Sequence, residues 1–196
     1  TDGYYMIVSP NEDEDAPVIT VDTAVGDVNL IDKTLRAPAS VDKTADKDDV
    51  VVDEIVTYTV AFQATNYYTA DTDSNSENDT HLITEYDITD IFDNLAFQSV
   101  SSICMYSDED FETQVGSDIK STATVSDVTD GKNISIPWAN EGAPLYNSPV
   151  WVVVTYTMKV TAGILDDGEA VNEATVSFKH ADSTDPVEVD DDDETV

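Results

Sequence analysis

Three polar side chains lie at positions where the sequence pattern calls for apolar ones. They are Lys43, Asp90 and Asn172, and each falls in a stretch with the residue alternation of a β-strand. In each stretch the alternation puts the polar residue on the apolar face. A lysine amine, a carboxyl group and a primary amide are the ingredients of a spontaneous isopeptide bond. The sequence therefore predicts a bond between Lys43 and Asn172, with Asp90 as the proton shuttle.

This chemistry depends on burial, because burial favours the uncharged forms of the amine and the carboxyl group. A neutral Lys43 amine is a competent nucleophile. A protonated Asp90 would polarise the Asn172 carbonyl and pass protons to the departing ammonia. Folding supplies the proximity that an inert amide needs, so we expect no cofactor.

Two other interpretations of the three residues are open. Lys43 and Asp90 could form a buried ion pair with Asn172 as a hydrogen-bonding neighbour, although such pairs often stabilise a fold less than apolar packing does. Alternatively, a one-residue error in the facing of a strand would put all three side chains in solvent.

Strands must position these residues, and the sequence is rich in them. Segments of Val, Ile, Thr and Tyr are separated by clusters of Asp, Asn, Gly and Pro, which is typical of an all-β protein. We expect an immunoglobulin-like β-sandwich with Greek-key connections. Residues 56–62 and 152–160 alternate most clearly and should supply much of the core. The expected strands include 4–8, 18–21, 28–31, 39–44, 54–64, 82–89, 96–105, 121–125, 133–136, 150–161 and 170–178.

The charge balance excludes two classes of partner. The 196 residues include 42 acidic and 8 basic side chains, which gives a net charge of −34. Nucleic acid is excluded because phosphate binding needs a basic surface, and an anionic membrane surface is excluded for the same reason. The single cysteine, Cys104, cannot form an internal disulfide. Its apolar neighbours predict a buried structural thiol.

Composition divides the chain into three parts. Residues 1–37 are expected to be N-terminal strands, and a boundary is expected near residues 36–38, where Pro38 interrupts strand pairing. Residues 38–181 form the sandwich. Residues 182–196 are expected to be an acidic linker or disordered tail, because their hydrophobicity is low and their charges repel one another.

An ordered set of segments carries a family resemblance over residues 38 to 180. The chain resembles the isopeptide-forming domain of fimbrial subunits, in particular the collagen-adhesin A type of sortase-assembled Gram-positive pilins and surface adhesins. The resemblance implies that Lys43 and Asn172 are joined across the first and last strands, with Asp90 as the catalytic residue. The segments are Val41-Asp42-Lys43-Thr44, residues 54–60, Tyr86-Asp87-Ile88-Thr89-Asp90 followed by Leu95-Ala96-Phe97, and residues 171–176.

The resemblance also implies a function. It predicts a structural, load-bearing module outside the cell, which neighbours other pilin or adhesin domains and is anchored to the cell wall through sequence outside this chain. The only chemistry would be the single-turnover bond formation, so the module is not an enzyme.

The N-terminal strands have a partial resemblance of their own. Residues 2–8 and 28–33 look like the closing strands of a preceding pilin domain, and Lys33 falls where sortase joins a lysine to the next subunit. However, Ile31 and Asp32 stand where the family motif has an aromatic residue and a proline. An ordinary surface lysine is therefore the alternative.

A ligand-binding adhesin domain is the competing interpretation, with a host glycan or matrix protein as partner. A polar insertion at 70–80 and several aromatic residues could form the binding surface. Asp71, Asp73 and Asn75 alternate like calcium ligands, but Ser76 replaces the glycine of a calcium loop and Leu82 replaces its glutamate. A flexible polar loop is favoured there, and calcium in another geometry stays open. The aromatic residues are Tyr67, Tyr68, Trp138, Tyr146 and Trp151.

Overall fold

The computed structural model describes residues 5–6, 18–19, 39–70 and 79–195. The chain divides into two compact units, Thr1–Lys33 and Thr34–Val196. In the first unit, β1 (Tyr5–Met6) pairs antiparallel with β2 (Val18–Ile19). Four predicted site residues lie outside the described residues, namely Lys33, Asp71, Asp73 and Asn75.

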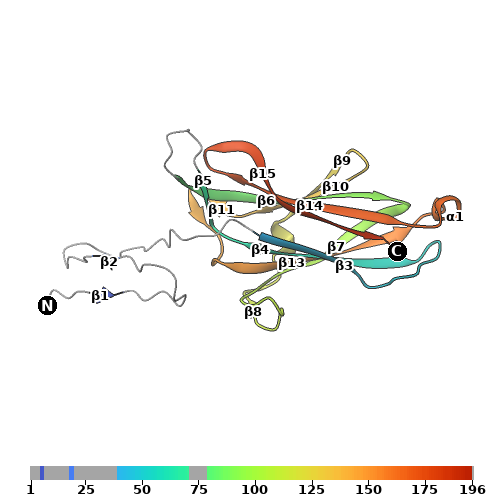
Figure 1. The fold of residues 1–196 in the computed structure, drawn as a ribbon, viewed down its shortest axis with the longest axis horizontal. Coiled ribbons are helices and arrows are strands. Elements are labelled where there is room, and N and C mark those ends of the chain that lie inside the picture. Colours follow the sequence, from blue (N-terminus) through green and yellow to red (C-terminus); the bar gives the residue numbers. More distant parts are fainter. Residues whose placement is uncertain (1–4, 7–17, 20–38, 71–78, 196) are drawn as a thin grey trace. The chain divides into compact units, whose positions relative to one another are not determined.

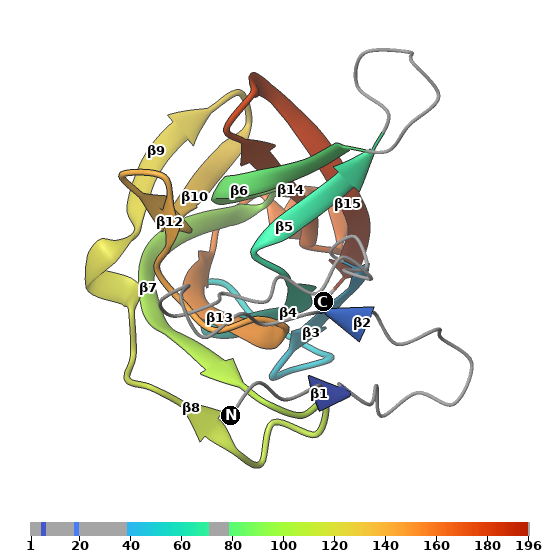
Figure 2. The same cartoon turned by 90° about the vertical axis from the view of Figure 1, so that its left-hand side faces the viewer.

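The second unit consists of two antiparallel sheets packed face to face (Figures 1 and 2). One sheet has the strand order β15-β14-β6-β10-β9, with β5 also paired to β6, and the other has the order β3-β4-β13-β7-β8. This confirms the predicted all-β, immunoglobulin-like sandwich. None of the helices in the described residues is long and apolar enough to cross a membrane. The strands of the first sheet are β5 (Tyr67–Ala70), β6 (Asp79–Asp93), β9 (Thr124–Val128), β10 (Gly131–Pro137), β14 (Val171–His180) and β15 (Ser183–Thr195).

The second sheet and the short elements complete this unit. The strands of that sheet are β3 (Ala39–Ala45), β4 (Ile55–Ala64), β7 (Leu95–Tyr106), β8 (Gln114–Val115) and β13 (Val150–Val160). The short elements are the 3₁₀-helix η1 (Lys120–Thr122), the hairpin of β11 (Ala139–Asn140) with β12 (Ala143–Pro144), and the helix α1 (Ile164–Asp167).

The core lies between the sheets and is formed by every second residue of the long strands. Along β13, buried and partly buried residues alternate without interruption, because successive side chains of a strand point to opposite faces. β4 pairs with β13 over its whole length, with Val60 opposite Val154. The prediction that these two strands supply much of the core is confirmed. The largest wholly buried side chains are those of Trp138, Tyr58, Tyr86, Tyr156, Phe62 and Phe178.

The acidic C-terminal segment is a strand, so the prediction of a linker or disordered tail is wrong for most of it. Residues 183–195 form β15, which pairs with β14 from Val171↔Thr195 to His180↔Ser183. Val187 and Val189 pack against the core. Pairing with an existing strand satisfies the backbone of a segment whose own side chains are mostly acidic, and two valines on one face add apolar contact.

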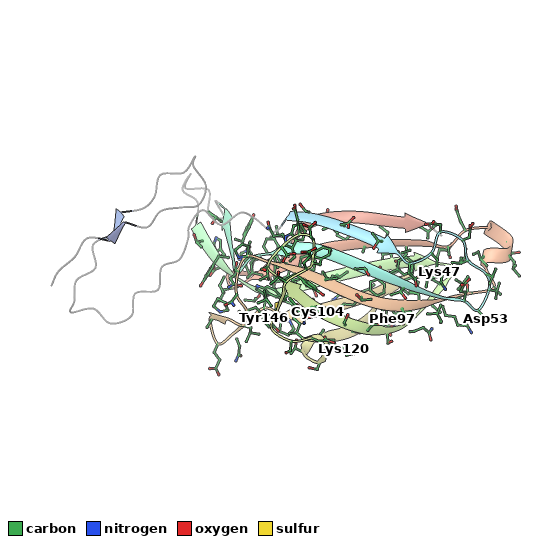
Figure 3. The ribbon with its side chains drawn as sticks, turned by 90° about the horizontal axis from the view of Figure 1, so that it is seen from below. Lys47, Asp53, Phe97, Cys104, Lys120 and Tyr146 are labelled. Atoms are coloured by element: carbon green, nitrogen blue, oxygen red, sulfur yellow. The ribbon has the colours of Figure 1, made fainter. Side chains whose placement is uncertain are left out.

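The prediction for Cys104 also needs correction (Figure 3). Ile103 and Met105 are buried on the inner face of β7, so Cys104 between them points outward and is only partly buried. Burial and the nearby Asp118 raise the pKa of this thiol, which disfavours the reactive thiolate.

Candidate functional site

The structure brings Lys43, Asp90 and Asn172 together between the two sheets. Lys43 comes from β3 of one sheet, and the other two come from β6 and β14 of the opposite sheet. Lys43 Nζ lies 3.3 Å from Asp90 Oδ1, and the exposed fraction of both side chains is 0%. Asn172 is also fully buried. The interpretation that places all three in solvent is therefore wrong.

Strand register explains why Asp90 and Asn172 are neighbours. Ala174 of β14 pairs with Asp90, and Asn172 pairs with Phe92. Asn172 and Asp90 are therefore diagonal positions on one face of adjacent strands, a spacing that side chains of this length can bridge.

A fourth residue, Tyr156 of β13, links the carboxyl group to the amide. Its hydroxyl donates a hydrogen bond to Asp90 Oδ1 at 2.7 Å and accepts one from Asn172 Nδ2 at 3.3 Å. The strand alternation at residues 152–160 predicts only a core position for this tyrosine. The available signal was a hydroxyl on a strand face whose other residues are apolar, since a buried tyrosine hydroxyl usually has a partner.

Two acceptor oxygens of the site have no donor among the described residues. They are Asp90 Oδ2 and Asn172 Oδ1, and both are buried. A buried acceptor without a hydrogen bond is costly. A proton on the Asp90 carboxyl group would turn one acceptor into a donor, so the arrangement favours a protonated acid beside the amide.

Burial raises the pKa of Asp90 from 3.8 to about 6. The charge of Lys43 opposes this rise, and so do hydrogen bonds from Tyr156, Lys43 and Asn172. If the amine were neutral, the opposing charge would be absent and the pKa of Asp90 would be higher still. A neutral amine and a protonated acid therefore support each other at this site.

Apolar groups enclose the polar atoms. Lys43 Nζ lies 5.5 Å from the centroid of the Tyr58 ring, and the rings of Tyr58 and Phe97 each stack on Tyr156 at 5.9 and 6.0 Å. Asn172 Nδ2 also donates to Met158 Sδ at 3.6 Å. Such a lining keeps water out and strengthens the electrostatic interactions inside.

Gly131 fixes the backbone beside Asp90. It pairs with Ile91 across the β10–β6 ladder, and a Cβ atom at this position would lie 2.1 Å from the Asp90 carbonyl oxygen. Only glycine permits this close approach. The position of Asp90 therefore depends on a residue that touches none of the reacting groups.

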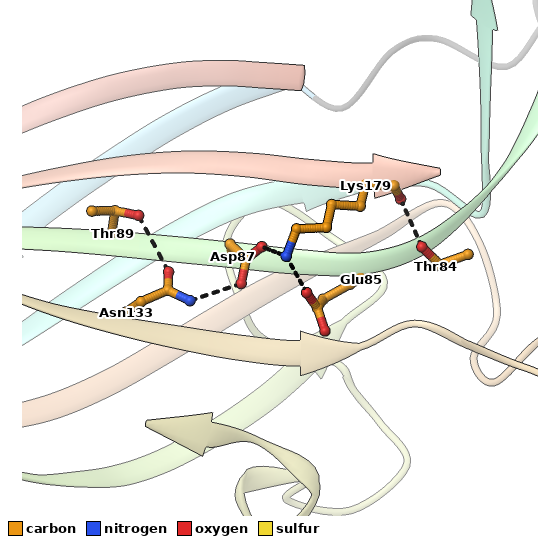
Figure 4. A network of polar contacts seen from close by, with 6 residues as sticks. All are labelled: Thr84, Glu85, Asp87, Thr89, Asn133 and Lys179. Atoms are coloured by element: carbon orange, nitrogen blue, oxygen red, sulfur yellow. Dashed lines mark hydrogen bonds and ion pairs between the residues drawn. The ribbon is translucent and has the colours of Figure 1, made fainter. Parts of the chain in front are cut away.

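A second set of the same three residue types lies on the outer face of the sheet (Figure 4). Lys179 Nζ lies 2.8 Å from Asp87 Oδ2, and Asn133 Nδ2 donates to Asp87 Oδ1 at 2.9 Å. Here the lysine side chain is 34% exposed, and the hydrogen bonds that it donates to Asp87 and Glu85 raise its pKa. Lys179 therefore stays charged and is a poor nucleophile, which makes this set an internal control for the buried one.

The aromatic residues proposed for ligand binding do not form one exposed surface. Trp138 is wholly buried, and its Nε1 donates to Asn66 Oδ1 at 2.9 Å. Its ring packs against Tyr86 and Tyr146. The possibility that Trp138 belongs to an exposed binding surface is therefore wrong, because the ring completes the core at the end of β10.

Comparison with known proteins identifies the fold. No protein-family model and no curated protein matches the sequence. Domains D2 and D3 of the major pilin SpaD from Corynebacterium diphtheriae match with a TM-score of 0.55 and 20% identity, over 80% of this chain and 51% of that chain. Full-length SpaD matches with a TM-score of 0.55 and 19% identity, over 80% and 35%. The group B streptococcus pilus 2b backbone protein matches with a TM-score of 0.48 and 21% identity, over 79% of this chain and 55% of that chain.

The chain spans about half of the SpaD fragment and about a third of full-length SpaD. At these identities the likeness is one of fold. The chain has the fold of Gram-positive pilin domains, as the resemblance of its sequence predicts.

Proposed function

We propose that this chain is a load-bearing structural module of a cell-surface pilin or adhesin, stabilised by an autocatalytic isopeptide bond between Lys43 and Asn172. The observation that carries the proposal is the buried contact of 3.3 Å between Lys43 Nζ and Asp90 Oδ1, with the Asn172 amide joined to Asp90 through Tyr156. A domain of pilin fold is the setting in which such a bond has a mechanical use.

The reaction is an amide exchange. Lys43 Nζ, as a neutral amine, attacks Asn172 Cγ and forms the new C–N bond. The bond from Cγ to Nδ2 then breaks, and Nδ2 leaves as ammonia with one proton that originated on the lysine amine. No oxidant, reductant or cofactor is needed.

Asp90 is the group that moves this proton. As an acid it donates to the Asn172 carbonyl oxygen and stabilises the charge that develops there, and as a carboxylate it accepts the proton from the attacking amine. Tyr156 holds Asp90 Oδ1 in place and contacts the leaving nitrogen. A pKa near 6 lets Asp90 exist in both forms close to neutral pH.

The bond would close a loop from Lys43 to Asn172, 129 positions apart. By analogy with disulfides, closing so long a loop stabilises a fold by roughly 4 to 5 kcal/mol through chain entropy. The bond would also carry tension directly from β3 to β14. The only cysteine, Cys104, cannot supply an internal disulfide for this purpose.

The proposal also covers the location of the protein and the partners next to it. We infer an extracellular position in a cell-wall-anchored fibre or adhesin, with other domains of the same protein or assembly as neighbours. The fold supports this inference, and the net charge of −34 suits a highly solvated surface. Recognition of a host glycan or matrix protein stays a prediction, and so does a sortase-linked Lys33.

The intact mass of the denatured protein tests the bond. We expect the wild-type protein to be lighter than its calculated mass by one ammonia. Lys43→Met should have its full calculated mass, because the nucleophile is gone. Lys179→Met is the matched control, since it removes the lysine of the exposed set, and it should still lose one ammonia.

Proteolysis and mass spectrometry should then recover a branched peptide that joins the segments containing Lys43 and Asn172. Circular dichroism of Lys43→Met would verify that the variant folds. A folded wild-type protein with its full calculated mass would overturn the proposed bond and leave the fold without this chemistry.

A further inference from the structure

The two histidines of the chain, 99 positions apart, lie side by side. The sequence contains His81 and His180 and no other histidine. Their ring centroids are 4.8 Å apart. One nitrogen of each ring and a carboxylate oxygen of Asp182 all lie within 4.8 Å of one another. Two histidines and an aspartate within that distance are a typical ligand set for a metal ion.

A β-bulge brings the two rings to the same face. Lys179 pairs with Glu85, but the next residue, His180, pairs with Ile83, so the ladder skips Thr84. The extra residue in β6 changes which side chains point inward. As a result both His81 and Tyr86 are buried in β6, although an unbroken alternation would put them on opposite faces.

The rings are held in a largely buried position. The exposed fractions of His81 and His180 are 6% and 7%, and Tyr68 packs against His180 with a centroid distance of 5.9 Å. Asp182 is in the turn between β14 and β15, and its Oδ2 lies 2.6 Å from His81 Nδ1. The Asp182 side chain is exposed. A hollow lined by Thr84, His180 and Asp182, among others, opens beside the turn, so a small ion could reach the cluster from solvent.

One atom of the cluster lacks a partner. His180 Nδ1 is buried and has no hydrogen bond within the described residues. A buried polar nitrogen without a partner carries a free-energy cost. Burial and the neighbouring His81 lower the pKa of His180, which favours the neutral ring that a metal ion requires.

We propose that His81, His180 and Asp182 form a binding site for a divalent transition-metal ion of the Zn²⁺ class. The two imidazoles supply nitrogen ligands, and the carboxylate either completes the set or holds His81 Nδ1–H so that the other ring nitrogen faces the ion. Water fills the remaining position of a three-residue site.

The ligand chemistry selects the class of ion. Imidazole suits Zn²⁺, Ni²⁺ and Cu²⁺, whereas Ca²⁺ and Mg²⁺ prefer oxygen ligands throughout. This site is therefore distinct from the possible calcium loop at Asp71, Asp73 and Asn75 that the sequence pattern suggests. It is also independent of the isopeptide bond, because it shares no residue with the buried set.

A bound ion would connect strands that are far apart in sequence. His81 is near the start of β6, His180 ends β14, and Asp182 precedes β15. The ion would fix the β14–β15 turn to β6 at the end of the sandwich where β5 lies (Figure 1). We therefore expect metal binding to stabilise this hairpin.

Isothermal titration calorimetry tests the site, with tag-free wild-type protein that has been treated with a chelator and exchanged into buffer. We expect Zn²⁺, added as ZnCl₂, to bind at one ion per chain and to raise the midpoint temperature of thermal unfolding. CaCl₂ and MgCl₂ at the same concentrations should leave the midpoint unchanged. His81→Gln and His180→Gln should each weaken Zn²⁺ binding by at least about tenfold, and Asp182→Asn should weaken it less.

Two controls separate this site from general attraction to an acidic surface. Asp185→Asn removes an exposed carboxylate from β15, close to Asp182 in sequence, and should keep wild-type affinity. Circular dichroism in chelator verifies the fold of each variant. Equal Zn²⁺ affinity in the folded His81→Gln/His180→Gln double variant would overturn the proposal. Weak binding of many ions per chain, shared by Ca²⁺, would also overturn it.

Discussion

The hydroxyl of Tyr156 donates a 2.7 Å hydrogen bond to Asp90 Oδ1 from the opposite sheet. This contact exists only when the two sheets are packed, because β13 and β6 belong to different layers. It ties the orientation of the carboxyl group to the completion of the core. The chemistry proposed for Lys43 and Asn172 therefore depends on a residue that neither loses nor gains a covalent bond.

Replacing Tyr156 with phenylalanine should slow bond formation while keeping the ring in the core. The variant loses the hydrogen bond that orients Asp90 and the contact with the leaving nitrogen. The measurement is a time course of ammonia loss by intact mass, starting from refolding. Tyr86→Phe is the matched control, since its buried hydroxyl bonds to Thr65 instead. Equal slowing in both variants would assign the effect to general destabilisation.

The pKa of Asp90 predicts a pH dependence in the variant without a bond. In Lys43→Met the folded state should prefer protonated Asp90 more than it would beside a charged lysine, because the charge of Lys43 lowers the pKa of Asp90 and the variant lacks it. A raised carboxyl pKa means that the folded state binds more protons than the unfolded state. The free energy of unfolding should therefore fall as the pH rises from near 4 through and beyond 6.

The loss should be at least about 3 kcal/mol, the equivalent of a pKa shift from 3.8 to about 6, because that value includes the lowering by Lys43 that the variant lacks. Urea unfolding across this pH range measures it. Lys43→Met/Asp90→Asn is the reference, because it has the same acidic surface and lacks the titrating group. Parallel pH profiles for the two proteins would contradict a raised pKa at Asp90.

Gly131→Ala should impair the site without removing any reacting group. The added Cβ would approach the Asp90 carbonyl oxygen to 2.1 Å, so the β6 backbone must shift. We expect a loss of about 1–3 kcal/mol in stability and slower ammonia loss. Gly142→Asn is a suitable control, because nothing lies within 4 Å of a Cβ at Gly142 and asparagine tolerates its φ of +81°. Unchanged kinetics in Gly131→Ala would show that Asp90 can move freely.

Pulling the second unit from its two ends should distinguish protein that carries the Lys43–Asn172 bond from protein that lacks it. If the wild type carries the proposed cross-link, the chain between Lys43 and Asn172 should not extend, because tension would pass through that bond. In Lys43→Met, unfolding should release these 129 residue spacings, which corresponds to about 43–46 nm of contour length. Single-molecule force spectroscopy measures the difference. A release of this size in a wild-type molecule of ammonia-depleted mass would contradict the proposed linkage.

Much of the buried set could be predicted because strand periodicity is local. Val41, Lys43 and Ala45 are every second residue of a short segment and so share one face of the strand. The same spacing places Asp90 and Asn172 on the faces of their apolar neighbours. A period of two determines which residues share a face once the strand is recognised. The part played by Tyr156 could not be predicted, since a tyrosine in a core strand reads as packing whether or not its hydroxyl has a polar partner.

Other features depend on contacts that no local pattern contains. The acidic segment at 183–195 forms a strand because β14 offers it an edge, and composition alone does not reveal that edge. The histidine pair depends on a bulge in β6 and on 99 positions of intervening chain. Trp138 follows a proline, which is common in loops, yet its ring fills the core.

The presence of β15 after β14 changes where a cross-linked molecule can yield. Asn172 is near the start of β14, and the C-terminal end of β15 pairs beside it, with Val171 opposite Thr195. A pull on the C-terminus would open this hairpin from its free end, one pair at a time, while everything between Lys43 and Asn172 stays closed. Such a hairpin would dissipate a sudden load by reversible extension: it would lengthen under the load and close again when the load falls.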